Sequence, residues 1–203
     1  MSTLTKTPLL LETIKIDEGK IYNLPYHQKR CDDSRKSLFH SDHILNLSSI
    51  IKPPLTGLYK CRIIYADTLH SIEYVPYQEK EIHSLKIVPS TMSYDFKYAN
   101  RAKLNALLSK FPHSDELIIE KDGYLTDSTM ANIAFYDGTQ WITPTNPLLK
   151  GTIRQKLLDE GFLVLKDITS ADLKEYTQVA LMNAMIGFKI LKHIHPKEIE
   201  GIT

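Results

Sequence analysis

The first part of this chain alternates apolar and polar residues mainly with the period of a β-strand. Leu9–Ile16 is apolar and β-branched, and a turn at Asp17–Lys20 leads into Ile21–Leu24 as its expected hairpin partner. The basic segment His27–Phe39 is expected to be helical, before polar residues and Pro53-Pro54 interrupt the pattern. Further extended segments are expected at Leu58–Tyr65, at Ser71–Val75 and within Ile82–Val88.

From about Tyr94 the pattern changes to helices that alternate with short strands. Apolar residues recur at helical spacing over Leu104–Phe111, and further helical pieces are expected at Gly151–Leu158 and Ala171–Tyr176. Short strands are expected at Leu117–Ile119, Tyr124–Thr126, Asn132–Tyr136, Gln140–Thr143, Phe162–Leu165 and Val179–Met182. This mixture predicts an α+β protein with two α/β lobes, a small one over residues 1–90 and a larger one over residues 91–203.

The composition is that of an ordinary globular protein, and it excludes several classes of function. The 203 residues contain 25 Lys and Arg against 24 Asp and Glu, which gives a formal charge of +1. This balance argues against a dedicated binder of nucleic acid or of anionic membranes. Apolar runs are too short to span a bilayer, residues 1–20 lack the features of a signal peptide, and Cys31 and Cys61 form no motif. We therefore expect a cytoplasmic protein whose partners include neither nucleic acid nor a membrane.

The common phosphate-binding and nucleophile motifs are absent from the sequence. No GxGxxG, GxxxxGK[ST] or GxSxG stretch occurs, so the usual dinucleotide, P-loop and hydrolase readings lack support. His193 and His195 could place two imidazoles on one face of a strand, but no set of carboxylates or cysteines accompanies them. We expect no metal site.

Several short blocks occur in a fixed order along the chain, most of them between Lys97 and Arg154. They are H-x-x-R at His27–Arg30, K-x-x-N-R at Lys97–Arg101, G-x-L-T-D-x-x-x-x-N-I at Gly123–Ile133, T-P at Thr143-Pro144, L-x-G-x-x-R at Leu149–Arg154 and N-A at Asn183-Ala184. With these blocks the chain resembles the class IV aminotransferase family of pyridoxal 5'-phosphate (PLP) enzymes, from about Leu9 onward. The K-x-x-N-R and N-A blocks are most similar to those of the 4-amino-4-deoxychorismate lyases within that family.

The resemblance implies the D-amino acid aminotransferase-like fold, fold type IV, and assigns roles to individual residues. Lys97 is implied as the catalytic lysine that binds PLP as a Schiff base and then moves the substrate's α-proton, while the PLP ring acts as an electron sink. Asp127 stands where the family normally has glutamate, beside the pyridine nitrogen, and its side chain is one methylene shorter. Its contact with the ring nitrogen would therefore require a backbone shift or a bridging water.

The phosphate of PLP needs oriented N–H donors and a cation. By the resemblance, the donors come from Gly151, Thr152 and Ile153 at a helix start, and the cation is Arg30. Asn183 and Ala184 match a second phosphate-binding turn of the family.

Residues for the substrate are less well defined than those for the cofactor. Arg62 lies on an expected strand and could hold a substrate carboxylate, and Arg101 is expected on the first turn of the helix that follows Lys97. Familiar relatives begin with an additional strand and have a tyrosine before the acid that Glu12 matches. This chain is shorter there and has Leu11 at the tyrosine position.

The resemblance thus implies a PLP-dependent lyase like 4-amino-4-deoxychorismate lyase, which releases pyruvate through a Lys97 aldimine and serves folate biosynthesis. One alternative is an aminotransferase acting on a small branched-chain or D-amino acid. Another is a PLP-binding protein with little catalysis, which Asp127 and the short N-terminus would favour. The expected partners are an amino-acid-like small molecule and a second copy of the chain in a homodimer.

Overall fold

The computed structural model describes residues 7–201, and the first six residues of the short N-terminal segment lie outside that range. The chain forms two compact units. The first contains residues 7–78 and Phe96–Arg101, and the second contains Glu79–Asp95 and residues 102–201. The sequence pattern had placed one boundary near residue 90. The chain instead leaves the first unit at Gln78 and returns to it for the six residues around Lys97.

The first unit is built on a four-stranded antiparallel sheet with the strand order β2-β1-β3-β4. Its strands are β1 (Leu10–Asp17), β2 (Lys20–Ile21), β3 (Leu58–Tyr65) and β4 (Leu69–Pro76). The alternating pattern of the sequence predicted three of these strands closely. The hairpin partner of β1 is much shorter than expected, because helix α1 already begins at Leu24.

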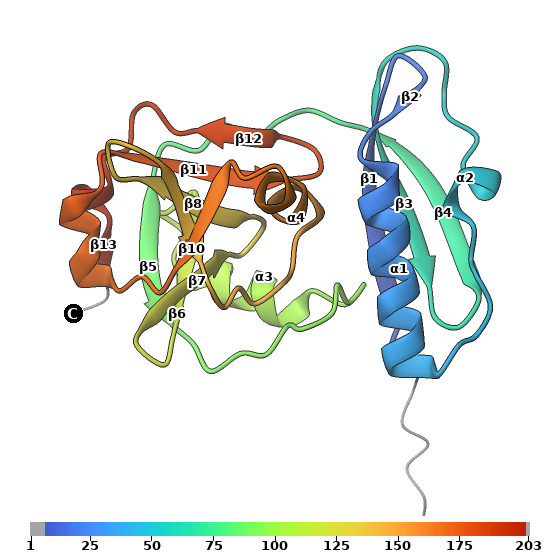
Figure 1. Cartoon of the computed structure of the whole chain (residues 1–203), viewed down its shortest axis with the longest axis horizontal. Coiled ribbons are helices and arrows are strands. Elements are labelled where there is room, and N and C mark those ends of the chain that lie inside the picture. Colours follow the sequence, from blue (N-terminus) through green and yellow to red (C-terminus); the bar gives the residue numbers. More distant parts are fainter. Residues whose placement is uncertain (1–6, 202–203) are drawn as a thin grey trace, which may run out of the picture. The chain divides into compact units, whose positions relative to one another are not determined.

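Helix α1 (Leu24–Phe39) lies along one face of this sheet (Figure 1). Pro25 stands in its first turn, where a missing N–H costs nothing. The short helix α2 (Leu47–Ile50), which the sequence pattern did not predict, adds Leu47 to the same core. Ile14, Ile63 and Tyr65 are fully buried there, and each such side chain contributes roughly 1.5–3 kcal/mol to folding.

The second unit is built on a nine-stranded mixed sheet. The order along its main path is β10-β9-β8-β7-β6-β5-β13, and β11 pairs with both β8 and β12. Its strands are β5 (Leu85–Pro89), β6 (Glu116–Lys121), β7 (Tyr124–Ser128), β8 (Asn132–Tyr136), β9 (Trp141–Pro144), β10 (Leu163–Lys166), β11 (Gln178–Asn183), β12 (Gly187–Ile190) and β13 (Glu200–Gly201). Asp122 and Gly123 both have positive φ in the tight turn between β6 and β7, as the Asp-Gly pair predicted.

Short helices complete the second unit. They are α3 (Ala102–Ser109), α4 (Thr152–Asp159) and two 3-10 turns at Ser170–Glu175 and Pro196–Glu198. The core is centred on β6, β7, β8 and β11, where Ile118, Ile133 and Phe135 are fully buried. His193 and His195 could have shared one face of a strand, but neither lies in a strand: His193 is in a turn, His195 precedes the 3-10 turn at Pro196, and both are exposed. No helix of residues 7–201 is long and apolar enough to span a membrane.

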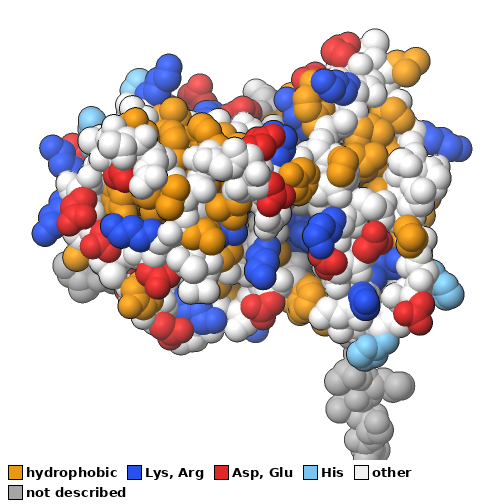
Figure 2. All heavy atoms as spheres, in the orientation of Figure 1, with side chains coloured by type: hydrophobic (Ala, Val, Ile, Leu, Met, Phe, Trp, Pro, Cys, Tyr) orange, Lys and Arg blue, Asp and Glu red, His pale blue; other side chains and the backbone are white. Residues whose placement is uncertain are grey.

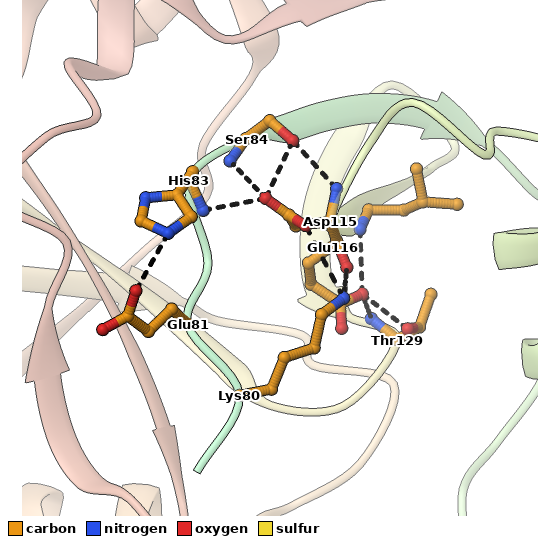
Figure 3. Close-up of polar contacts among 8 residues, drawn as sticks. Lys80, Glu81, His83, Ser84, Asp115, Glu116 and Thr129 are labelled. Atoms are coloured by element: carbon orange, nitrogen blue, oxygen red, sulfur yellow. Dashed lines mark hydrogen bonds and ion pairs between the residues drawn. The ribbon is translucent and has the colours of Figure 1, made fainter.

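Polar contacts hold the segment that enters the second unit onto β6 (Figure 3). The Asp115 carboxylate accepts hydrogen bonds from the backbone of His83 and Ser84, and the Ser84 hydroxyl accepts one from the Asp115 backbone. Lys80 forms an ion pair with Asp115, and Glu79 is paired with Lys189 on β12. These contacts fix the parallel register of β5 and β6. Strand β6 forms a hairpin with β7, and Asp127 lies on β7.

Candidate active site

Lys97 belongs to the first unit although it lies 80 residues beyond the end of β1 in the sequence. Its carbonyl accepts a hydrogen bond of 2.8 Å from the Leu11 N–H, and the Ala99 N–H donates one of 2.8 Å to Leu9. Tyr98 forms an isolated antiparallel bridge with Leu10. The backbone of Lys97 is thus held at the edge of β1.

Arg101 does not lie on a helical turn shared with Lys97, as had been expected. Helix α3 begins at Ala102, and the segment Phe96–Arg101 belongs to the first unit, where Lys97 and Ala99 are hydrogen-bonded to Leu11 and Leu9. The half-buried Arg101 still acts on Lys97 electrostatically, since its charge helps to lower the pKa of the Lys97 amine.

A buried acid, Glu12, stands at the centre of the charged groups near Lys97. It is fully buried on β1 and accepts two hydrogen bonds from Arg30, of 2.9 Å from Nε and 2.6 Å from Nη2. His27 Nδ1 lies 2.5 Å from Glu12 Oε2. Burial alone would raise the pKa of Glu12, but Arg30 and His27 lower it to about 2. Burial lowers the pKa of His27, so at neutral pH a neutral His27 donates its Nδ1 hydrogen to an ionised Glu12.

The amine of Lys97 has an unusually low pKa. Burial is the largest cause, and the positive charge of Arg30 lowers the pKa further, while Glu12 raises it. The net result is a pKa of about 7, well below the ordinary value of 10.5. A substantial part of this lysine is therefore neutral at physiological pH and can act as a nucleophile or a base.

In the second unit, the Asp127 carboxylate accepts hydrogen bonds from two residues. Oδ1 accepts a hydrogen bond of 2.6 Å from the Asn132 side chain, and Oδ2 accepts one of 2.8 Å from the Leu149 N–H. Burial raises the pKa of Asp127 to about 7, although these two donors and the nearby Arg154 charge oppose the rise. Asp127 is only 5% exposed, so it is not a solvated aspartate of a simple turn.

The turn that follows Asp127 is fixed by a second buried acid. Glu116 accepts hydrogen bonds from the Thr129 hydroxyl at 2.5 Å and from the Thr129 N–H at 3.0 Å (Figure 3). The Ser128 hydroxyl accepts two further bonds from Met130 and Ala131. This rigid turn sets the position of β8 and hence of Asn132 beside Asp127.

The loop before α4 is shaped by Asn132 and Gly151. Asn132 Nδ2 also donates to the Leu149 carbonyl at 2.8 Å, so both backbone groups of Leu149 are held by side chains. A Cβ on Gly151 would lie only 1.9 Å from Asn132 Oδ1. Gly151 is the N-cap of α4 and provides no side-chain cap, so the helix start at Thr152 and Ile153 is of the kind that binds an anion.

Asn183 and Ala184 form the turn between β11 and β12. Asn183 Oδ1 accepts hydrogen bonds from the backbone of Met185 and Ile186, and Nδ2 donates to the Met130 carbonyl at 3.3 Å. The Asn183 side chain therefore shapes this turn and joins it to the turn after Asp127.

Arg62 lies on β3, opposite Thr13 and Glu73. Its half-exposed side chain is 4.0 Å from Glu73, a separation at which an exposed ion pair contributes little. Arg62 is thus accessible from the sheet face opposite α1, while Glu12 faces the core.

Arg154 is the last residue of the L-x-G-x-x-R block, and the sequence alone indicates no role for it. It is buried, its Nη2 donates to the Pro144 carbonyl at 2.8 Å, and its charge acts on Asp127. Within residues 7–201 its buried Nε has no hydrogen-bond partner.

The mixed α/β fold with few helices, together with the similarity to known proteins, identifies a PLP-dependent enzyme of fold type IV. The model of the family "Amino-transferase class IV" matches residues 63–194. The chain therefore belongs to the class IV aminotransferase family, whose members depend on PLP.

Similar proteins of comparable length are known. An uncharacterized protein of Haemophilus influenzae is 35% identical over 184 residues, which cover 88% of this chain and 98% of that protein. The "Putative aminodeoxychorismate lyase" of Schizosaccharomyces pombe is 30% identical, over 86% of this chain and 85% of its own. The crystal structure of a protein from Haemophilus somnus 129pt, given as a "putative 4-amino-4-deoxychorismate lyase", has a TM-score of 0.78 and 34% identity, covering 89% and 97% of the two chains.

Proposed function

We propose that this enzyme binds PLP at Lys97 and catalyses a lyase reaction that releases pyruvate, as in 4-amino-4-deoxychorismate lyases. The observation that carries the proposal is Lys97, whose backbone is held at the edge of β1 and whose amine, under the charge of Arg30, has a pKa of about 7. The names of the relatives from S. pombe and H. somnus support the substrate class. The substrate would be 4-amino-4-deoxychorismate, and the second product would be 4-aminobenzoate for folate synthesis.

The residues present fit PLP. Gly151 leaves room that a Cβ would fill, and the start of α4 has no side-chain cap. Lys97 would hold the aldehyde carbon of the cofactor, Arg30 and the N–H groups of Thr152 and Ile153 would hold its phosphate, and Asp127 would serve the pyridine nitrogen. Asn183 and Ala184 would shape the second phosphate-binding turn. When bound, PLP supplies an electron sink for the carbanion formed at the substrate's α-carbon.

The chain's own residues would then transfer protons and bind the negative charges of the cofactor and the substrate. The neutral form of the Lys97 amine can take the α-proton and return it at another carbon. Arg30, fixed by Glu12, keeps positive charge where a dianion would be bound. Arg62, accessible on β3, would hold a substrate carboxylate, and Arg101 would add positive charge beside Lys97.

The test is a direct assay of the products. Purified enzyme is incubated with PLP and 4-amino-4-deoxychorismate, and pyruvate and 4-aminobenzoate are measured together. We expect the parent enzyme to form both products in equal amounts, and we expect Lys97→Ala to form neither. A known lyase assayed in parallel serves as the positive control. If that control is active and the parent enzyme forms neither pyruvate nor 4-aminobenzoate, the lyase proposal is wrong.

Two other functions remain distinct in this assay. An aminotransferase on a small branched-chain or D-amino acid would instead show turnover that depends on an added keto acid. The other alternative is a PLP-binding protein with little catalysis. It is favoured because both carboxylate oxygens of Asp127 already accept hydrogen bonds, from Asn132 and from Leu149. That protein would bind PLP at Lys97 and show no turnover with either class of substrate.

We also propose that the enzyme is a cytoplasmic homodimer. Strand β10 is the last strand of the sheet order, so one of its edges presents backbone groups for pairing. Figure 2 shows hydrophobic side chains on the surface of the second unit in the region of β10 and β12. Phe162, Leu165 and Ile190 are exposed there by 44%, 47% and 37%. A second copy that covers this surface would remove both features from water.

A further inference from the structure

The buried position of Glu12 needs an explanation beyond folding. On the inner face of β1 it alternates with Leu10 and Ile14, both of which are fully buried. An aliphatic residue there would cost less free energy to bury during folding, because an ionised carboxylate loses its hydration when it is buried. The charge is present together with three polar contacts from two residues, Arg30 and His27, which indicates a role for the charge itself.

The partners of Glu12 come from one face of helix α1. His27 and Arg30 are three residues apart, so both side chains point toward β1. Arg30 uses Nε and Nη2 for Glu12, which fixes the plane of its guanidinium. His27 contributes the 2.5 Å contact to the same oxygen that accepts from Arg30 Nη2. Glu12 is thus the anchor that determines how Arg30 is oriented.

The same group lies beside Lys97. The N–H of Leu11, next to Glu12, is bonded to the Lys97 carbonyl. The charges that act on the Lys97 amine are Arg30 and Arg101, which lower its pKa, and Glu12, which raises it. Glu12 is the acidic member of this set, and without it the amine would face positive charge alone.

We propose that Glu12 is a positioning residue, which orients the Arg30 guanidinium and balances the positive charge beside the Lys97 amine, and that His27 holds Glu12 in place. This inference rests on the proposed roles of Lys97 and Arg30. Glu12 itself touches neither substrate nor cofactor in this account, and it acts through Arg30 and Lys97.

The first experiment measures the Lys97 amine in protein freed of cofactor. Competitive labelling with acetic anhydride over a range of pH, followed by mass spectrometry of the Lys97 peptide, gives the midpoint of its titration. The midpoint should lie near pH 7 in the parent, fall by about one pH unit in Glu12→Gln, and rise by about as much in Arg30→Gln. A purely structural role would not produce shifts of opposite sign.

The other groups near Glu12 do not interfere with this measurement. Burial raises the pKa of Cys31 to about 12 and also raises that of Tyr65, so both stay uncharged across the range. Burial lowers the pKa of His27, which favours its neutral form near pH 7. Asp33→Asn is the matched control on α1, since Asp33 forms only an exposed ion pair with Lys29. It should leave the midpoint unchanged.

The second experiment compares PLP with pyridoxal, which lacks the phosphate. Binding of each compound is measured by absorbance titration in the parent, Glu12→Gln, Arg30→Gln and the double variant. If Glu12 orients Arg30, Glu12→Gln should lower the preference for PLP over pyridoxal by about tenfold. The double variant should lose no more preference than Arg30→Gln alone, because Glu12 then has nothing left to orient.

The outcomes separate this inference from the proposed function. If borohydride fixes PLP on Lys97 but Glu12→Gln changes neither the midpoint nor the preference, the inference is wrong and the proposed function stands. If PLP is not bound at Lys97, the proposed function is wrong. Shifts of the Lys97 midpoint in opposite directions in Glu12→Gln and Arg30→Gln would still show that Glu12 balances the positive charge beside the amine. Should Glu12→Gln fail to fold, Arg30→Gln decides alone, and an unchanged Lys97 midpoint in that variant would overturn the inference.

Discussion

Asn132 and Gly151 are in such close contact that a side chain cannot be added at position 151. A Cβ there would lie 1.9 Å from Asn132 Oδ1. The φ of Gly151 is −71°, which other residues adopt readily, so the need for glycine comes from space and not from the backbone. Asn132 cannot easily move away, because its Nδ2 is bonded to both Asp127 and Leu149.

Gly151→Ala should therefore destabilise the protein and weaken PLP binding together. Displacing Asn132 breaks two buried hydrogen bonds, and overpacking of this kind costs roughly 1–3 kcal/mol. Urea unfolding and PLP titration measure the two effects. Gly201→Ala is the matched control, because among residues 7–201, its chain neighbour apart, no atom lies within 4 Å of the added Cβ. Equal behaviour of the two variants would show that Asn132 is free to move.

Lys97 should be the lysine that carries PLP. Reduction of the loaded enzyme with borohydride, followed by peptide mapping, is expected to place the label on Lys97 because its amine has a pKa of about 7. Lys97→Arg should remove the label and abolish activity, since arginine stays protonated. Lys103, exposed on α3, is the control position. A label on Lys103 or Lys121 would refute the assignment.

The fold was predictable where the pattern of apolar residues has a clear period. The strand expected over Leu58–Tyr65 matches β3 at both ends, helical spacing identified α3, and the two glycines at positions 151 and 161 marked the ends of α4. Strands β12 and β13 were missed because neither shows a period. β13 has two residues and exists only through its parallel pairing with β5, more than a hundred residues earlier.

The sequence indicates candidate residues for the site but not the contacts that those residues make. The resemblance identified Lys97 and Asp127, yet their partners Leu11 and Leu149 depend on long-range pairing that a local pattern does not contain. One signal for the buried ion cluster was available. Glu12 falls on the apolar face of its strand, and a charge in that position requires partners such as those that H-x-x-R supplies from one helical face.

A homodimer should be seen by light scattering at micromolar concentration. If the surface around β10 is covered by a second copy, Leu165→Lys places a charge in the interface and should shift the mass toward that of a monomer. Leu55→Lys is the control, because Leu55 is 81% exposed in the first unit. A monomer mass for the parent would contradict the dimer itself. A dimer unchanged in Leu165→Lys would place the interface elsewhere.

Asp127 should make the stability of the cofactor-free protein depend on pH in an unusual direction. Burial raises its pKa in the folded protein from 3.8 to about 7, so the folded state binds the proton more tightly than the unfolded state does. Between about pH 4 and pH 7 this group therefore lowers the free energy of unfolding as the pH rises. Asp127→Asn lacks the titration, and the parent's advantage over the variant should shrink by on the order of 1–4 kcal/mol across that range.

Asp137→Asn provides the opposite control for this measurement. Hydrogen bonds from the backbone of Gln140 and Thr139 lower the pKa of Asp137 to about 2, so its contribution is present above about pH 4 and is lost as the pH falls toward 2. Urea unfolding of the parent and both variants from pH 3 to pH 8 should thus give two separate windows. If the difference between the parent and Asp127→Asn stays constant from pH 4 to pH 7, the carboxyl is ionised throughout. The contacts from Asn132 and Leu149 would then outweigh its burial.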